Sequence, residues 1–257
     1  MRLSITHTTH YDYDEPVPYG LLQIRLTPKS RTSQKVQSWA NTIIGGKREA
    51  AFEDEHANTV ELISFEVGST SLEIRSEGVV ETTDTQGIVG PQGGFVPLWC
   101  FQRRTDLTRP GPNVRKLLKS FDAPEDDIPR LHALSAAILE TVEYRPGRTD
   151  ANTPSEAAIG AGEGVCQDHA HIFVTAARLL GYPSRYVSGY LWMPDRIDQE
   201  AGHAWAEAWV DGIGWIGFDV SNGKSPDDHY VRVATGLDSA EAAPITGTRV
   251  GTAGESM

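Results

Sequence analysis

Apolar and polar residues alternate with a period of two along much of the first 110 residues. The alternating runs are rich in β-branched and aromatic residues, and turn residues such as Gly45-Gly46 separate them. Such alternation between regular turns is typical of antiparallel strands. We therefore expect a β-rich N-terminal domain over residues 1–110, folded as an antiparallel sheet or sandwich. The runs are Leu3–Thr9, Leu21–Leu26, Thr59–Val67 and Leu72–Thr82.

The period changes after a linker-like stretch, Thr105–Asn113, that contains Pro110-Gly111-Pro112. Apolar residues then recur at helical spacing, and strand-like segments follow them, so we expect an α+β core over residues 111–234. Residues 235–257 have no hydrophobic period and predict a flexible tail. The predicted helices cover 114–121, 128–139 and 166–181, and the predicted strands cover 185–191, 203–210 and 215–219.

The charge balance restricts the partners. The chain of 257 residues has 23 Lys and Arg against 35 Asp and Glu, a net charge of −12. Phosphate backbones and anionic membrane surfaces repel such a chain, so we expect neither nucleic acid nor membrane as a partner. No apolar run suits a membrane helix or a signal peptide. Two cysteines form no disulfide framework, which predicts a reduced, cytoplasmic protein.

Cys166 is the first residue whose setting suggests chemistry. It follows Gly162-Glu163-Gly164-Val165 and precedes an apolar helix, so the thiol should lie at a helix N-terminus. The unpaired N–H groups there can stabilise a thiolate and hold an oxyanion. A free cysteine is also often a small buried hydrophobe, and the spacing alone leaves both interpretations open.

His203 and Asp219 lie on neighbouring predicted strands. His203 shares a strand face with Trp205, Glu207 and Trp209, which suits an apolar wall around a reactive imidazole. A short turn joins its strand to the one ending at Asp219, so antiparallel pairing can bring the carboxylate to the imidazole. Taken singly, the histidine can be an ordinary strand residue and the aspartate a turn initiator.

Four segments together resemble bacterial transglutaminase-like proteins. They are similar to the Cys motif, the segment after the Cys helix, the His motif and the Asp motif of that family, with matching spacings of 37 and 16 residues. The N-terminal segments Thr8–Tyr13 and Gln23–Pro28 resemble the β-rich region that accompanies bacterial members. The four segments are Gly164–His171, Arg185–Tyr190, Gly202–Glu207 and Trp215–Asp219.

The resemblance implies a papain-like core in which Cys166 is the nucleophile, His203 the general base and acid, and Asp219 the group that orients the ring. Such a thiol enzyme acts on a peptide or glutamine-type amide of a protein or peptide substrate through an acyl-enzyme thioester. Water as acceptor makes it a cysteine peptidase or amidase, and an amine acceptor makes it a transglutaminase. The sequence leaves the acceptor, the substrate and the oligomeric state open.

Other residues are candidates for holding the oxyanion or the substrate. The backbone N–H of Cys166 is one oxyanion donor, and Tyr144, Gln167 and Trp205 are candidates for positioning, with packing or helix capping as the alternative. Apolar neighbours predict that Cys100 is a packing residue. We expect His7 and His10 to be surface or packing residues.

Two other functions compete with a thiol enzyme. One is a non-catalytic peptide-binding module on the same fold. The other is a zinc-dependent hydrolase using Cys166, Asp168, His169 and His171, whose spacing is poor because residues two apart do not share a helix face. The chain has no H-E-x-x-H, paired C-x-x-C or calcium-loop motif, so we predict no metal and no cofactor.

Overall fold

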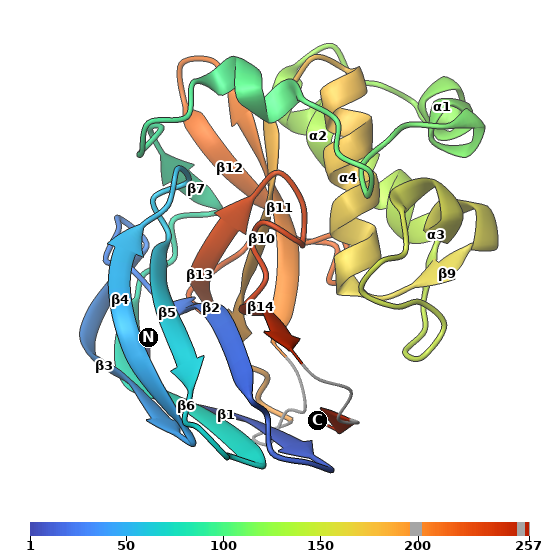
Figure 1. The fold of residues 1–257 in the computed structure, drawn as a ribbon. Helices are drawn as coiled ribbons and strands as arrows, with labels where there is room; N and C mark the ends of the chain where they lie inside the picture. The colour runs from blue at the N-terminus through green and yellow to red at the C-terminus, as the bar shows by residue number, and fades with distance from the viewer. Residues whose placement is uncertain (196–201, 251–254, 257) are drawn as a thin grey trace.

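The computed structural model describes residues 1–195, 202–250 and 255–256 and has the predicted α+β architecture (Figure 1). A β-rich part built mainly from the N-terminal third lies beside a mixed part in which helices cover a sheet. Within the described part of the chain we find no helix that could span a lipid bilayer.

The N-terminal part is a sandwich of two four-stranded antiparallel sheets, in the orders β15-β1-β6-β3 and β14-β2-β5-β4. Alternation places apolar side chains of both sheets in one core, which includes Ile24, Ile63 and Ile74. The predicted strands of this region are therefore confirmed, and strands over 34–53 are added. The bounds are β1 Arg2–Tyr13, β2 Tyr19–Thr27, β3 Gln34–Ile44, β4 Gly46–Glu53, β5 Thr59–Phe65, β6 Ser71–Thr82, β14 Ile245–Val250 and β15 Glu255–Ser256.

The second part has a five-stranded antiparallel sheet in the order β13-β10-β11-β12-β7. Helix α4 packs against β10 and β11, and Phe173 of this helix stacks on Phe218 with ring centroids 5.0 Å apart. The strands are β7 Ile88–Gly90, β10 Ser184–Leu191, β11 His203–Val210, β12 Gly214–Phe218 and β13 Tyr230–Gly236, with a short parallel pair, β8 Glu143–Tyr144 and β9 Glu163–Gly164. The helices are α1 Pro112–Ser120, α2 Asp127–Thr141, α3 Ser155–Ala161 and α4 Cys166–Leu179.

The boundary between the two parts lies earlier than the predicted residue 110. Strand β7 pairs with β12, with Gly90 opposite Trp215, so it belongs to the second sheet. Phe101, in the short 3₁₀ helix Leu98–Gln102, packs edge-on against Trp215 at 5.0 Å. Gly and Pro break this stretch too often for a periodic signal, which is why the sequence did not assign it to the core.

The structure also differs from the predicted flexible tail over residues 235–250. Strand β13 continues to Gly236, Ala242 is fully buried, and β14 pairs with β2 from Ile245 opposite Ile24 to Val250 opposite Tyr19. Backbone pairing and small side chains hold this segment, so no hydrophobic period marks it. Residues 251–254 and 257 of the predicted tail lie outside the described residues.

Two side-chain amides of the N-terminal sandwich bind the backbone of β13. Gln34 accepts from the Arg232 N–H and donates to the Arg232 carbonyl, both at 2.8 Å. Asn58 makes the same exchange with Thr235, at 2.7 and 2.9 Å. Both amides are buried, so they satisfy polar groups at the edge of the second sheet that water does not reach.

Replacement of Gln34 by Ala should lower the free energy of unfolding by about 2 kcal/mol or more, because a buried N–H and a buried C=O lose their partner. Urea unfolding monitored by tryptophan fluorescence measures the change. Gln37→Ala is the matched control, since Gln37 on the same strand is exposed and its side chain bonds Glu81 at the surface. Equal stability of the two variants would contradict a role for Gln34 in joining the two parts.

Candidate active site

Cys166 is the first residue of α4, as predicted. A Cβ on Gly164 would lie 2.8 Å from the Asp168 side chain, so the approach to the helix needs a glycine there. Asp168 is buried, and its Oδ2 accepts from the Val165 N–H at 2.8 Å and from the Thr149 hydroxyl at 2.7 Å. Asp168 therefore caps the residue before Cys166, whose own N–H has no acceptor within the helix.

Strand pairing brings His203 and Asp219 together. Phe218 lies opposite Ala206, which sets Asp219 one step further along, diagonal to His203. His203 Nε2 is 2.6 Å from Asp219 Oδ2, and because the carboxylate only accepts, Nε2 carries the proton. The second ring nitrogen, Nδ1, is then the atom that makes the hydrogen bond between His203 and Cys166.

Further donors fix the Asp219 carboxylate. The Tyr230 hydroxyl and the Asn222 side-chain amide each donate to Oδ2 at 2.7 Å. Burial raises the pKa of Asp219, but the hydrogen bond from His203 and those from Asn222 and Tyr230 outweigh burial and lower it. The carboxylate thus stays charged and held in place behind the imidazole.

The imidazole is protonated at neutral pH in this setting. Burial lowers the pKa of His203, but hydrogen bonds to Asp219 and Cys166 and their negative charges outweigh burial and raise it to about 9. Trp205 stacks on the ring at 6.2 Å and also packs edge-on against Tyr230. The ring therefore has one apolar face, one carboxylate partner and one thiol partner.

Cys166 and His203 open into a cavity of about 260 Å³ between the two parts of the molecule. Its walls come from α4, β10 and β11, from β1 and β2 of the sandwich, and from the segment before β14. The lining residues are His7, Arg25, Leu26, Val165, Cys166, Gln167, Tyr186, Ser188, Gly189, Tyr190, Gly202, His203, Ala204, Val233 and Pro244.

Tyr186 is a lining residue to which the sequence analysis gave no role. It lies on β10, and burial, followed by the nearby Cys166 charge, raises the pKa of its phenol well above the usual range. The hydroxyl therefore keeps its proton at neutral pH and remains a hydrogen-bond donor. A tyrosine inside an apolar strand carries no sequence signal that separates this position from packing.

The three candidate positioning residues have different surroundings. Gln167 lines the cavity, but its amide is directed to the carbonyls of Asp150 and Ala151, at 3.4 and 3.2 Å. Trp205 is buried under the imidazole and does not line the cavity. Tyr144 is half exposed and contacts the ring of His169, and its backbone pairs beside Gly164 rather than reaching the cavity wall.

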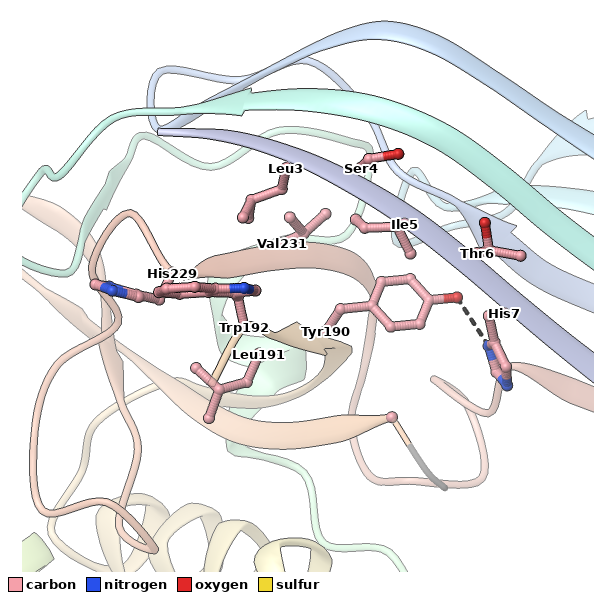
Figure 2. A pocket seen from close by; sticks show the side chains of 11 residues that line it. Leu3, Ser4, Ile5, Thr6, His7, Tyr190, Leu191, Trp192, His229 and Val231 are labelled. Atoms are coloured by element: carbon pink, nitrogen blue, oxygen red, sulfur yellow. Dashed lines mark hydrogen bonds between the residues drawn. The ribbon is translucent and has the colours of Figure 1, made fainter. Parts of the chain in front are cut away.

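His7 is a packing residue, as expected, with its ring edge-on against Tyr190 and the centroids 5.6 Å apart. It lines the cavity, and its Nδ1 hydrogen-bonds the Tyr190 hydroxyl at 2.9 Å. Figure 2 shows this pair at one end of a neighbouring pocket, at whose other end Trp192 stacks on His229. Because His7 and Tyr190 line both pockets, the pair forms a partition between them.

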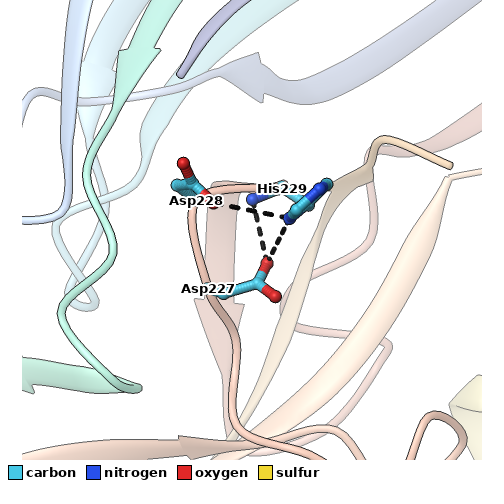
Figure 3. A group of neighbouring side chains, drawn as sticks. All are labelled: Asp227, Asp228 and His229. Carbon is cyan, nitrogen blue, oxygen red and sulfur yellow. Dashed lines mark hydrogen bonds and ion pairs between the residues drawn. The ribbon is translucent and has the colours of Figure 1, made fainter. Parts of the chain in front are cut away.

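The residues of the zinc hypothesis do not converge. His169 hydrogen-bonds the Val142 carbonyl and Ser221, and His171 Nε2 accepts from the Ser239 N–H, on different sides of α4. Burial and then the Arg178 charge lower the pKa of His171 to about 3. A separate group that could accommodate a cation, Asp227, Asp228 and His229, lies on the loop before β13 (Figure 3).

Glu207, which shares the strand face of His203, is part of an ionic cluster rather than of the site. Its carboxylate binds Arg185 Nε at 2.6 Å and Arg232 Nε at 2.7 Å, and all three side chains are buried. Burial raises the pKa of Glu207, but the charges of the two guanidinium groups outweigh burial and lower it to about 2.

Comparison with known proteins agrees with the resemblance seen in the sequence. Residues 3–81 match the bacterial transglutaminase-like N-terminal region, and residues 115–220 match the transglutaminase-like superfamily. The uncharacterized protein ML0607 of Mycobacterium leprae is 28% identical over 96% of this chain and 92% of its own length. The uncharacterized protein Rv2569c of Mycobacterium tuberculosis is 27% identical over 96% of this chain and 87% of its own.

A solved structure shares the fold across the whole chain. The crystal structure described as "a Putative Cysteine Protease from Cytophaga hutchinsonii" has a TM-score of 0.75 and 22% identity, covering 100% of this chain and 90% of that one. The chain thus contains a segment that matches the transglutaminase-like superfamily, preceded by one that matches the bacterial transglutaminase-like N-terminal region.

Proposed function

We propose that the protein is a thiol enzyme that cleaves a peptide or glutamine-type amide through an acyl-enzyme thioester. The observation that carries the proposal is that the His203 imidazole hydrogen-bonds both Asp219 and Cys166. Cys166 lies at the N-terminus of α4, and both Cys166 and His203 line the cavity. Nucleophile, base and orienting group in such contact form the arrangement of thiol and serine acyl-transfer enzymes.

The first half-reaction forms the thioester. The reaction starts with the proton of the Cys166 thiol already on His203 Nδ1, and Sγ attacks the amide carbonyl carbon. The Cys166 N–H and the Tyr186 hydroxyl are the donors that the cavity offers to the resulting oxyanion. The tetrahedral intermediate collapses, the C–N bond breaks, and the imidazolium gives its proton to the departing amine.

The second half-reaction releases the acyl group. His203 takes a proton from water or from a primary amine, whose oxygen or nitrogen attacks the thioester carbonyl. The C–S bond breaks, the sulfur leaves as the thiolate and the proton stays on His203, so the enzyme is regenerated. Water gives a peptidase or amidase and an amine gives a transglutaminase, and both acceptors fit the same residues. The cytoplasmic location stays a prediction.

A library of glutamine-containing peptides, incubated with and without a primary amine, tests the proposal. Mass spectrometry follows the loss of ammonia, peptide cleavage and amine incorporation. Cys166→Ala should give no product, and Tyr186→Phe should lower kcat by about 10²-fold if the phenol holds the oxyanion. Peptide binding to the wild type without any product would favour a non-catalytic binding module on this fold.

A further inference from the structure

The wall opposite the catalytic residues contributes a cation to the cavity. Arg25 of β2 lines the same cavity as Cys166 and His203, and its side chain is only 13% exposed. No aspartate or glutamate is among the described residues that line this cavity. Among the described lining residues Arg25 is the only arginine or lysine, in a chain whose net charge is −12.

The backbone around Arg25 departs from regular pairing. The register of β2 with β5 shifts between Ile24 and Thr27, whereas on the other side of β2 the Arg25 N–H donates to the Pro244 carbonyl at 2.7 Å and continues the pairing with β14. Pro244 and Leu26 also line the cavity. Such an irregularity can re-aim a side chain, and Arg25 beside it lines the cavity.

The Asp54 carboxylate, which accepts several other hydrogen bonds, fixes one edge of the Arg25 guanidinium. Arg25 Nε donates to Asp54 Oδ2 at 3.1 Å, and Asp54 also accepts from the His56 N–H, the Asn58 N–H and the Asn58 amide. One terminal nitrogen of Arg25 donates to Gln23 at 3.3 Å. A guanidinium has five N–H donors, so its terminal edge retains donors for a planar anion.

We infer that Arg25 selects the substrate class, and that the preferred substrates are short peptide amides with a carboxylate next to the scissile bond. The inference rests on the proposed function, because it assigns the substrate of the same site. A carboxylate fits the terminal guanidinium edge with two parallel hydrogen bonds, whereas a neutral amide offers one acceptor and a repelled donor. The cavity is slightly smaller than those that hold drug-sized ligands, which favours a short segment.

Paired peptides test the inference. The probes are acetylated tetrapeptide amides with one donor Gln, in which each of the other three positions carries in turn Glu or Met, a neutral residue of similar length that is no donor. At one position the wild type should prefer Glu by about tenfold or more in kcat/KM. The ratio should fall to near one in Arg25→Gln and partly recover in Arg25→Lys. Arg75→Gln, on the exposed face of β6, should keep it.

A binding measurement separates the two proposals. Calorimetry of the same peptides with Cys166→Ala, with and without Arg25→Gln, needs no turnover. Arg25-dependent Glu preference without turnover in the wild type would support the substrate class and contradict the catalytic proposal. Turnover without preference at any position would overturn the substrate class alone, and neither turnover nor Arg25-dependent binding would overturn both.

Discussion

Replacement of His203 by Ala should lower turnover at least about 10⁴-fold and slow alkylation of Cys166 by iodoacetamide about tenfold at neutral pH. An ordinary thiol is only a few per cent ionised at pH 7, whereas an imidazolium beside the sulfur favours the thiolate. Mass spectrometry of tryptic peptides reports Cys166 and Cys100 in the same sample. Cys100, which is free and half-buried, should react slowly in both proteins.

The pH dependence follows from the raised pKa of His203. The ring holds its proton below about pH 9, so kcat/KM should fall as the pH rises through that value and the acid for the leaving amine is lost. Asp219→Asn removes a charge that raises this pKa, so the alkaline limb should move to lower pH. Asp122→Asn, at an exposed position, should leave the profile unchanged.

Equal, slow alkylation of Cys166 and Cys100 by iodoacetamide in the wild type would refute an activated nucleophile.

Glu207→Gln should lower the free energy of unfolding by about 3–5 kcal/mol, because it leaves two buried guanidinium groups, Arg185 and Arg232, without a counter-charge. Burial makes the loss large, since water cannot replace the carboxylate. Urea unfolding at pH 7 measures it, and Glu77→Gln, at a half-exposed surface pair, is the matched control with an expected change below about 1 kcal/mol.

The same cluster predicts an acid dependence. The pKa of Glu207 is about 2 in the folded protein, below its ordinary value of 4.5, so its contribution is complete above about pH 4.5 and is lost as the pH falls toward 2. The wild type and Glu207→Gln should therefore approach each other in stability as the solution is acidified. A constant difference from pH 7 to pH 3 would show that Glu207 acts through packing rather than charge.

Local patterns in the sequence were enough to predict the elements that carry the three central residues. Cys166 begins α4, and the short turn between β11 and β12 sets Asp219 against His203, because both features depend on residues close together in the chain. Their catalytic roles remain proposals. The α+β class and the family resemblance are confirmed by the topology and by the matched regions.

The far wall of the cavity could not be predicted in the same way. Arg25 and His7 line it because the sandwich packs against β13, and the register of β2 with β5 shifts beside Arg25. The alternation of apolar and polar residues assigns Arg25 and His7 to the outer face of the sandwich. The spacing of residues within a strand does not show which other part of the protein packs against that face. The packing of residues 235–250 escaped prediction for a related reason, since it depends on backbone pairing with β2.

The docking of Gln34 and Asn58 on β13 limits how the protein can be divided. A fragment confined to residues 115–220 would lack β13, which pairs with β10 and supplies the Tyr230 hydroxyl to Asp219. Without β13, strand β10 would be an edge strand with unpaired backbone N–H and C=O groups, and such strands pair with other copies of the chain. Excising residues 115–220 should thus produce an aggregating, inactive polypeptide, because the sandwich is a required scaffold for this segment.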